Sequence, residues 1–312
     1  MNKLKIVYMG TPGFAVEPLR TLLDAGCRIS AVVTAADKPQ GRGMLLQPSD
    51  VKRFAVERSL PLMQPERLRS ADFVEALRSL EADLFVVVAF RMLPEAVWGM
   101  PPLGTINLHA SLLPDYRGAA PINHAVINGE KETGVTTFFI RSEIDTGEII
   151  MQRRIAIGDS ETAGELHDRL SGAGAALLLE TVRQIAAGNA KSFPQPLPAN
   201  LKPAPKLFRE NCKIEWNNPA EKLRNMIRGL SPYPGAWGEL NCAGKNMQVK
   251  IFKASAEKAE SNCKPGAVVS DGKNYLKIAC SDGFLYPEEI QLPGKKIMNI
   301  KSFMAGFVRQ DG

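Results

Sequence analysis

One run of residues, Leu84-Phe85-Val86-Val87-Val88-Ala89, constrains the fold of this chain more than any other segment. Six apolar residues in a row are typical of a β-strand that is buried on both faces. Strands of this kind occur in parallel sheets, because the connections between parallel strands place helices over both faces. The run therefore predicts an α/β domain in which this strand is central.

The segments on either side of this run fit the same architecture. Apolar runs at residues 6–9 and 31–34 predict two strands, and apolar residues at helical spacing between them predict the helix that joins them. Further strands are predicted at residues 105–109, 135–140 and 149–155, and a long helix is predicted at residues 161–187. Alternating strands and helices favour a mainly parallel sheet in a domain of residues 1–190.

A proline-rich stretch follows this domain. This stretch contains five prolines, Pro194, Pro196, Pro198, Pro203 and Pro205. They favour an extended linker over residues 191–206. Beyond it a helix is predicted at residues 220–228, and three dipeptides indicate hairpin turns, namely Ala243-Gly244, Asp271-Gly272 and Asp282-Gly283. We expect residues 207–312 to form a second domain, a small β-barrel.

The positive charge of the chain is concentrated in its C-terminal part. Residues 1–200 contain 21 Lys and Arg against 22 Asp and Glu, whereas residues 201–312 contain 18 against 11. This asymmetry indicates either a polyanionic partner or a solvated basic face, and the charge alone favours neither.

Cysteine spacing and hydropathy indicate the cellular compartment of the protein. The five cysteines form no C-x-x-C pair, which favours buried free thiols, a reducing cytoplasmic compartment and no zinc motif. The apolar run at residues 6–9 is too short for a signal peptide. The longest uncharged run, residues 96–114, contains glycines, prolines, Asn107 and His109, so no membrane-spanning segment is expected.

Motifs for the commonest nucleotide and hydrolase sites are missing from the sequence. No G-x-G-x-x-G follows the first predicted strand, and no phosphate-binding loop, serine-hydrolase elbow or H-E-x-x-H occurs. Gly10 and Gly13 are explained by a tight turn between a strand and a helix. The search for chemistry therefore narrows to the three histidines.

His109 is the catalytic candidate because it ends a predicted parallel strand. Active sites of open α/β sheets lie at that end, and Asn107, two residues earlier, projects to the same face. Asp145 lies in a turn between two later strands, where it is either a turn residue or a carboxylate that orients His109. The set suits acyl transfer to an amine, with the imidazole moving a proton and the amide binding the oxyanion.

Four motifs around these residues resemble those of the folate-dependent formyltransferases, which move a formyl group from 10-formyltetrahydrofolate to an amine. They are Asn107-x-His109, Ser111-Leu112-Leu113-Pro114, Arg117-Gly118-Ala119-Ala120-Pro121 and Asp145-Thr146-Gly147. The resemblance covers nearly the whole chain, with the motifs in the same order. It implies a Rossmann-like N-terminal domain, a C-terminal barrel similar to an oligonucleotide-binding fold, and a reaction without a metal.

The resemblance also implies a role for each matched residue. The catalytic trio of the family matches Asn107, His109 and Asp145. Its folate-binding loop matches Ser111, Leu112, Leu113 and Pro114. The strand end whose backbone is expected to hold the pterin ring of the folate corresponds to residues 87–92.

Two further stretches are similar to the branch of the family that formylates initiator methionyl-tRNA. Residues 37–43 match a loop that contacts the acceptor end of the tRNA, and Arg42, between two glycines, is expected to order on the RNA. Pro205-Lys206-Leu207 and Lys213-Ile214-Glu215-Trp216 match the start of the C-terminal domain, with Glu215 where aspartate is more usual. The implied tRNA-binding residues are Arg42 and Lys206, on a protein expected to be a monomer.

Three other functions stay open on the sequence. A formyltransferase acting on an amino sugar nucleotide would share the trio but would need neither the Arg42 loop nor the basic excess. A hydrolase that releases formate from the same folate would turn over without an acceptor. A non-catalytic RNA-binding module would explain the charge but would leave Asn107, His109 and Asp145 without a role.

Overall fold

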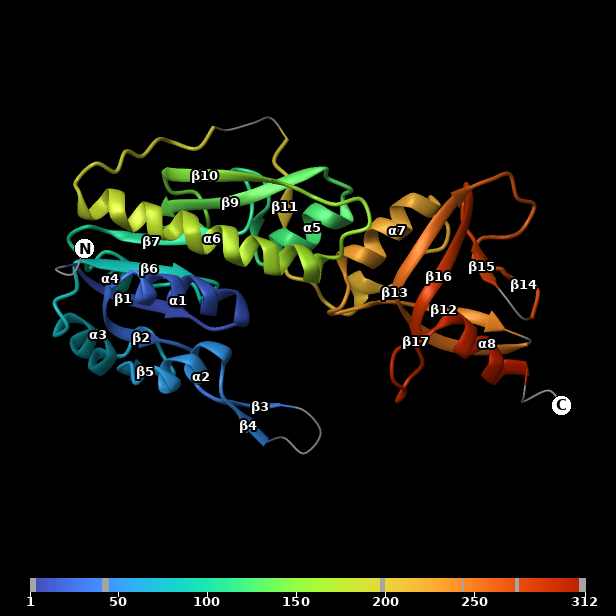
Figure 1. The fold of residues 1–312 in the computed structure, drawn as a ribbon, viewed down its shortest axis with the longest axis horizontal. Helices are drawn as coiled ribbons and strands as arrows, with labels where there is room; N and C mark the ends of the chain where they lie inside the picture. The colour runs from blue at the N-terminus through green and yellow to red at the C-terminus, as the bar shows by residue number, and fades with distance from the viewer. Residues whose placement is uncertain (1–3, 41–44, 197–199, 243, 273–274, 309–312) are drawn as a thin grey trace. The chain divides into compact units, whose positions relative to one another are not determined.

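The computed structural model describes residues 4–40, 45–196, 200–242, 244–272 and 275–308 (Figure 1). These residues pack into two compact units. The N-terminal unit draws on residues 1–118, 133–156 and 167–203, and the C-terminal unit on residues 119–132, 157–166 and 204–312. No helix among the described residues is long and apolar enough to cross a membrane.

The N-terminal unit is built on a seven-stranded sheet in the order β10-β9-β7-β6-β1-β2-β5. The strands are β1 (Lys5–Gly10), β2 (Arg28–Val33), β5 (Leu62–Met63), β6 (Leu84–Val88), β7 (Thr105–His109), β9 (Glu132–Phe139) and β10 (Ile149–Ala156). The pairs from β5 to β7 are parallel, and β7 pairs with β9 in the antiparallel sense. The prediction of a central, fully buried strand is confirmed, because β6 is fourth of seven and all its residues are buried.

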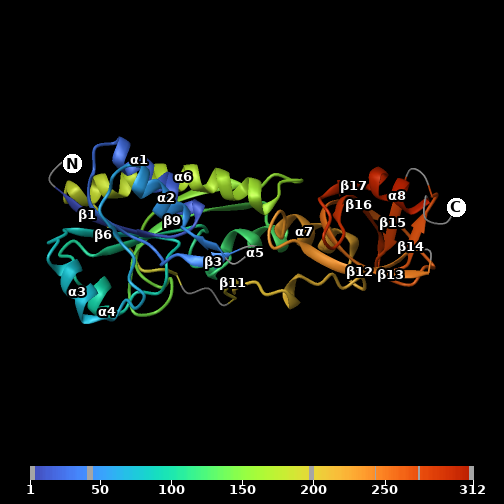
Figure 2. The same ribbon diagram turned by 90° about the horizontal axis from the view of Figure 1, so that it is seen from below.

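Helices cover both faces of this sheet. On one face, Val7 and Phe85 form a buried cluster with Phe73 and Leu77 of α3 (Ala71–Arg78) and with residues of α4 (Glu95–Trp98). The opposite face carries α1 (Val16–Asp24) and α6 (Ala163–Ala186), and Gly174 of α6 lies against Leu108 of β7. Figure 2 shows α1 and α6 on one side of the sheet and α3 and α4 on the other. This covering of both faces explains why β6 is a continuous apolar run.

The helices predicted at residues 161–187 and 220–228 are confirmed, with bounds within two residues of those predicted. Ten helical segments lie among the described residues. They are η1 (Gly13–Ala15), α1 (Val16–Asp24), α2 (Asp50–Glu57), α3 (Ala71–Arg78), α4 (Glu95–Trp98), α5 (Pro121–Ile127), α6 (Ala163–Ala186), η2 (Glu210–Cys212), α7 (Ala220–Gly229) and α8 (Ile300–Val308). Ser49 caps α2 by accepting a hydrogen bond from the Lys52 amide at 3.0 Å. Short strands complete the set at β3 (Lys38–Gln40), β4 (Leu45–Gln47), β8 (Arg117–Gly118) and β11 (Pro203–Ala204).

Gly10 ends β1 at a point where the backbone turns tightly into η1. A Cβ atom added there would lie 2.7 Å from the Ala15 Cβ and 3.0 Å from the Val88 carbonyl oxygen. A side chain would therefore separate the end of β1 from its neighbours, which gives the predicted tight turn a steric reason.

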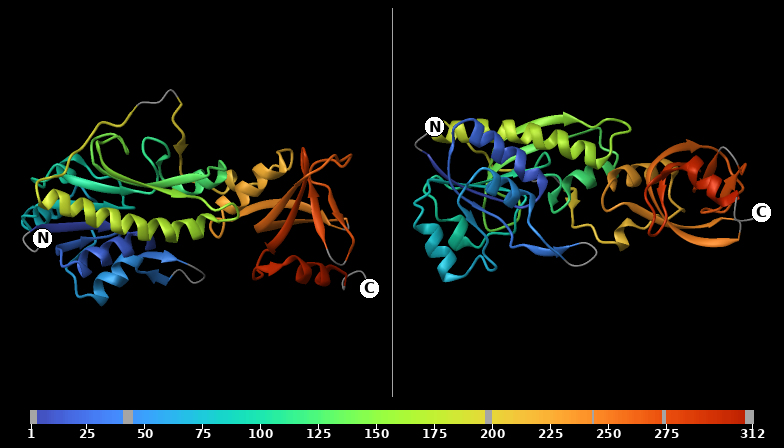
Figure 3. Two further views of the ribbon diagram at one scale, coloured as in Figure 1. Left: turned by 45° about the horizontal axis from the view of Figure 1, so that its top comes forward. Right: turned by 60° about the horizontal axis from the view of Figure 1, so that its bottom comes forward.

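The C-terminal unit contains a curled antiparallel sheet of six strands (Figure 3). Its strands are β12 (Ala236–Cys242), β13 (Lys245–Lys258), β14 (Val268–Ser270), β15 (Leu276–Ala279), β16 (Gly283–Gln291) and β17 (Met298–Asn299). Two of the predicted turns, Asp271-Gly272 and Asp282-Gly283, lie at junctions between antiparallel partners, because β14 pairs with β15 and β15 with β16. Strand β12 pairs with β13 in the same sense, and Ala243 of the third predicted turn lies outside the described residues. Residues of α7 and α8, including Leu223, Ile227 and Phe303, bury their side chains against this sheet.

The C-terminal unit also contains a helix from the first half of the chain. Helix α5 packs on α7, where the Asn123 side chain donates to the Gly229 carbonyl oxygen at 2.7 Å. A Cβ atom at Gly229 would lie 2.5 Å from the Ile127 side chain, so the two helices are in close contact. The compact units are thus discontinuous in sequence, and the domain bounds expected along the chain, at residues 1–190, 191–206 and 207–312, stay a prediction.

Three of the four cysteines whose side chains the structure describes follow the sequence expectation. Cys27, Cys212 and Cys280 are buried free thiols, whereas Cys263 is free and exposed. Burial raises the pKa of the Cys280 thiol to about 11. The expectation of buried thiols is therefore wrong for Cys263, which lies between β13 and β14, outside the core.

Candidate active site

Strand β7 brings Asn107 and His109 to one side of the sheet. Asn107 pairs with Val87 of the parallel strand β6 and with Phe138 of the antiparallel strand β9. Side chains alternate along a strand, so the amide of Asn107 and the imidazole of His109 share a face. They lie at the carboxyl end of β7, which is where α/β sheets place their sites.

The His109 imidazole is buried and has a defined orientation. Its Nε2 lies 2.9 Å from the Tyr116 carbonyl oxygen, and its Nδ1 lies 3.8 Å from Oδ2 of Asp145. A carbonyl oxygen only accepts hydrogen bonds, so we assign the hydrogen of the neutral ring to Nε2. Nδ1 is then the nitrogen that can take a proton, and it does so beside a carboxylate.

Asp145 is held in the turn between β9 and β10. Its Oδ2 accepts a hydrogen bond from the Gly118 amide at 2.9 Å, and its backbone is left-handed with φ of 54°. Few residues other than glycine adopt this conformation, and aspartate is one of those that do so most readily. A Cβ atom at Gly147 would collide with the Phe139 carbonyl oxygen, so the turn requires glycine there.

Gln195 fixes this turn and is a residue that the sequence analysis missed. Its Nε2 donates to the carbonyl oxygens of Asp145 and Gly147, both at 2.8 Å. Its Oε1 accepts from the Arg117 guanidinium, with Nη2 at 2.6 Å and Nε at 3.2 Å. Gln195 thereby connects the turn that carries Asp145 to the motif that contains Gly118. Its neighbours in sequence are prolines, which indicated only an extended linker.

A second contact ties down the same turn. The Ser192 hydroxyl donates to the Glu148 carboxylate at 2.6 Å, and the Arg141 guanidinium donates to it at 2.7 Å. The Ser192 hydrogen bond, with a further contribution from Arg141, lowers the pKa of Glu148 below its usual range. The segment around residues 192–195 therefore braces the second half of the turn, and Arg141 joins the start of the turn to Glu148.

Asn107 carries a polar atom without a partner. Its Oδ1 is buried and makes no hydrogen bond with the described residues. Leaving a buried acceptor unsatisfied costs about 1–3 kcal/mol, and such atoms are rare in native proteins. An amide with spare hydrogen-bonding capacity beside His109 fits a group that meets a substrate.

The loop after β7 is tightly folded, and only part of it is accessible. The Ser111 hydroxyl is buried and donates to the Asp115 carbonyl oxygen at 2.6 Å, and the Leu113 side chain is buried as well. Leu112 and Pro114 are partly exposed. Among the four residues matched to the folate-binding loop, only these two have partly exposed side chains, whereas Ser111 and Leu113 are buried within the loop.

The segment that follows β6 turns sharply at Ala89. This residue has φ of 46°, an uncommon value for a residue with a side chain, and it is exposed. Met92, three residues further on, is 72% exposed. The backbone of residues 87–92 therefore leaves the sheet abruptly beside β7, which pairs with β6.

Of the two residues predicted to bind tRNA, the structure describes one. Arg42 lies outside the described residues. Lys206 is exposed, and its Nζ lies 5.4 Å from the centre of the Phe208 ring. No three His, Cys, Asp or Glu side chains are grouped for a metal ion within the described part of the chain.

Comparison with known proteins defines the class to which this fold and site belong. Residues 4–182 match the formyl transferase family, and residues 206–308 match the formyl transferase C-terminal domain. The chain belongs to the formyl transferase family. Within it, the chain is 53% identical to a methionyl-tRNA formyltransferase of Bacteroides fragilis over 97% of this chain and 95% of the relative. It is equally identical to one of Parabacteroides distasonis, over 97% and 96%.

Solved structures share the fold at low identity. WlaRD, a sugar 3N-formyl transferase crystallised with dTDP and 5-N-formyl-THF, is 22% identical with a TM-score of 0.65, over 94% of this chain and 99% of that one. HypX from Aquifex aeolicus, in complex with tetrahydrofolic acid, is 19% identical with a TM-score of 0.65. The match covers 97% of this chain and 47% of HypX, so the chain spans about half of that longer protein.

Proposed function

We propose that the chain transfers the formyl group of 10-formyltetrahydrofolate to the α-amino group of the methionine on initiator methionyl-tRNA. The observation that carries the proposal is the geometry at the end of β7. There His109 has an acceptor at Nε2 and a carboxylate beside Nδ1, and the adjacent Asn107 has a buried atom without a partner. The kinship with methionyl-tRNA formyltransferases over nearly the full length supports the acceptor.

His109 acts as the general base in this proposal. Its Nδ1 takes the proton that the amine loses as the amine nitrogen bonds to the formyl carbon. The imidazolium then returns that proton to the folate nitrogen, whose bond to the formyl carbon breaks. The ring ends neutral, so no external acid or base is consumed.

Asp145 and Asn107 stabilise the charges that form during transfer. The Asp145 carboxylate, 3.8 Å from Nδ1, stabilises the positive charge on the imidazole. The Nδ2 group of Asn107 donates a hydrogen bond to the formyl oxygen as negative charge develops there, and its Oδ1, unpartnered among the described residues, is free to accept from an N–H of the attacking amine. Both groups are nearly immobile, because one is held by the Gly118 amide and the other is carried by a central strand. Such fixed groups need little reorganisation during the reaction.

The residues near the trio fit a folate. The pterin ring is flat and amphipathic, so it needs apolar side chains together with backbone donors and acceptors. Leu112 and Pro114 supply partly exposed apolar surface, and residues 87–92 leave β6 with an abrupt turn that frees backbone groups for a ligand. Those residues would hold the donor, which supplies the formyl group.

The tRNA is proposed to meet basic side chains of the C-terminal part. Lys206 is exposed, and residues 201–312 carry 18 Lys and Arg against 11 Asp and Glu. Arg42 is proposed as a further contact on chemical grounds, since a guanidinium binds phosphate or a base edge in a forked geometry. A cytoplasmic location, a monomeric state and a reaction without a metal stay predictions.

A direct assay separates this proposal from its alternatives. The protein is incubated with 10-formyltetrahydrofolate labelled on the formyl group and with methionyl-tRNA, uncharged tRNA or an amino sugar nucleotide. We expect label on methionyl-tRNA alone. Label on the sugar nucleotide, formate release without an acceptor, or binding of tRNA without transfer would each contradict the proposal and identify one of the alternatives.

A further inference from the structure

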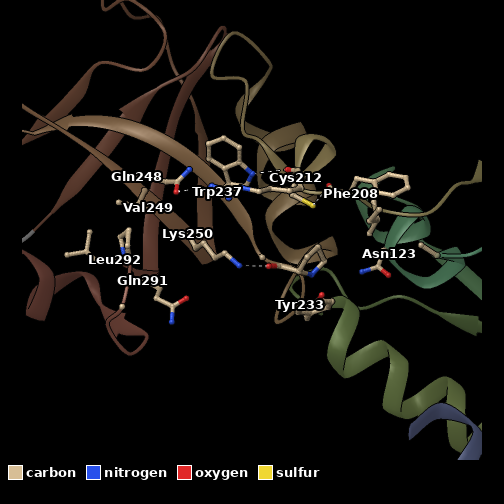
Figure 4. Close-up of a pocket in the computed structure, with 17 residues that line it drawn as sticks. Asn123, Phe208, Cys212, Tyr233, Trp237, Gln248, Val249, Lys250, Gln291 and Leu292 are labelled. Atoms are coloured by element: carbon tan, nitrogen blue, oxygen red, sulfur yellow. Dashed lines mark hydrogen bonds between the residues drawn. The ribbon is translucent and has the colours of Figure 1, made fainter. Parts of the chain in front are cut away.

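The C-terminal unit contains a cavity that the proposed chemistry does not use. Its volume is about 660 Å³, and three aromatic residues line it, Phe208, Tyr233 and Trp237 (Figure 4). All its lining residues belong to the C-terminal unit. His109, Asn107 and Asp145 belong to the other unit and are not among the lining residues.

Two of these aromatic rings are unusually exposed. Tyr233 is 83% exposed and Phe208 is 55% exposed, although aromatic side chains are normally well buried. Trp237 is half-buried, and its orientation is fixed because Nε1 donates to the Arg209 carbonyl oxygen at 2.9 Å. The cavity thus offers exposed aromatic faces next to one that is held rigidly.

Positive charge and amide groups surround these rings. The Arg209 guanidinium lies 5.2 Å from the centre of the Trp237 ring and donates to Gln248 at 3.2 Å. The Lys250 ammonium donates to the Pro234 carbonyl oxygen at 2.7 Å, as Figure 4 shows. The lining residues that the structure describes include no Asp or Glu. The cavity therefore favours an anion and disfavours a cation.

We propose that this cavity binds an unpaired nucleotide of an RNA, with its base on the aromatic rings and its phosphate near Arg209 and Lys250. Aromatic faces stack bases, amides such as those of Asn123 and Gln248 bind base edges, and cations bind phosphate. A nucleotide combines all three chemistries, whereas an apolar ligand would use only the rings. This inference rests on the proposed function, which identifies the RNA as a tRNA. The nucleotide proposed to bind in the cavity is a different one from the nucleotide that carries the methionine.

The test uses a short single-stranded RNA that contains one 2-aminopurine, whose fluorescence falls when the base stacks. We expect the full-length protein to quench this probe and to bind it more tightly than a blunt RNA duplex. Tyr233→Ala and Phe208→Ala should each weaken binding by about 5-fold to 150-fold, the range found for single stacking residues. Tyr275→Ala is the matched control, because Tyr275 is 39% exposed in the same unit but does not line the cavity.

The dependence of affinity on salt distinguishes stacking from general charge. Tyr233→Ala removes no cation, so the salt slope should be unchanged, whereas Arg209→Gln should lower that slope by about one phosphate contact. Equal affinities for Tyr233→Ala and Tyr275→Ala, or an unquenched probe, would overturn the inference. The inference would also be overturned if free AMP or GMP bound at the cavity while Tyr233→Ala left the affinity for tRNA unchanged. The ligand of the cavity would then be a free nucleotide and not a nucleotide of an RNA.

Failure of this inference is distinguishable from failure of the proposed function. If methionyl-tRNA is formylated by the wild-type protein but the single-stranded probe is not quenched, the cavity assignment alone is wrong. If the probe is quenched with the expected pattern but no formyl transfer occurs, the cavity assignment holds and the proposed reaction is wrong.

Discussion

Replacing Gln195 by alanine should slow catalysis although the hydrogen bonds of Gln195 go to Asp145, Gly147 and Arg117 and not to His109. Its amide makes hydrogen bonds to the carbonyl oxygens of Asp145 and Gly147 at 2.8 Å, and it accepts from Arg117. Asp145 occupies a left-handed conformation, so the turn relies on outside contacts to keep its carboxylate beside His109. Without Gln195 the turn can adopt other backbone conformations, in which the Asp145 carboxylate no longer lies beside His109.

The size of this effect follows from the bonds lost. An ordinary hydrogen bond contributes about 1 kcal/mol net, so removing the two that Gln195 donates costs the turn about 2 kcal/mol. If the conformation with Asp145 beside His109 loses all of this stabilisation of about 2 kcal/mol, kcat/KM falls ~30-fold. Gln195→Glu should be at least as harmful, because it turns the two donors into carboxylate oxygens that face carbonyl oxygens.

The assay is formyl transfer at saturating folate with varied methionyl-tRNA, for the wild type, Gln195→Ala and Gln184→Ala. Gln184 is an exposed glutamine of α6 and is the matched control. We expect the loss to fall on kcat, with thermal unfolding changed little. In an Asp145→Ala background, Gln195→Ala should add almost nothing, because coupled residues are not additive. Full additivity, or an unchanged kcat for Gln195→Ala, would refute the positioning role.

Three further predictions concern other parts of the molecule. Gly229→Ala should destabilise the protein by about 1–3 kcal/mol, measured by thermal melting, because its Cβ would overlap Ile127 where α5 meets α7. Iodoacetamide should label Cys263 of the native protein near neutral pH and spare Cys280, as peptide mass mapping would reveal. Cys280 should be spared because burial raises the pKa of its thiol to about 11, so little of the reactive thiolate is present near neutral pH. Arg42→Lys should leave the melting temperature unchanged but reduce kcat/KM for methionyl-tRNA, and equal kinetics would reduce Arg42 to general electrostatics.

Local sequence patterns predicted the elements that position the trio. The apolar run at residues 84–89 predicted β6 because a sheet covered on both faces tolerates only apolar side chains there. The strand at residues 105–109 was predicted with the bounds of β7, and the alternation of side chains along it predicts that Asn107 and His109 share a face. These features depend on spacing within one element, which a single sequence records.

Contacts between distant segments could not be predicted in the same way. Gln195 reaches a turn 50 residues earlier in the chain, and the surrounding prolines indicated only its backbone conformation. Likewise, the burial of Ser111 and Leu113 follows from how the loop folds back on Asp115 and packs beside Phe138. Nothing in the residue types marks which members of that loop stay accessible.

The aromatic cavity was missed for a related reason. Phe208, Tyr233 and Trp237 come from segments that are ordinary in composition, and aromatic residues in a predicted barrel are normally assigned to its core. Their exposure arises because Phe208 precedes η2 and Tyr233 follows α7, both outside the strands of the sheet. The basic excess of residues 201–312 indicated a polyanionic partner but not a place where a base could stack.

The central claim is that His109, aided by Asn107 and Asp145, moves the proton during formyl transfer. Its most direct test is the rate of a single turnover, with enzyme in excess over methionyl-tRNA and with labelled 10-formyltetrahydrofolate, for the wild type and His109→Ala. We expect the rate to fall by about 10²–10⁴-fold, the usual contribution of general acid–base catalysis, while folate binding is largely kept. A single-turnover rate for His109→Ala close to that of the wild type would contradict the account.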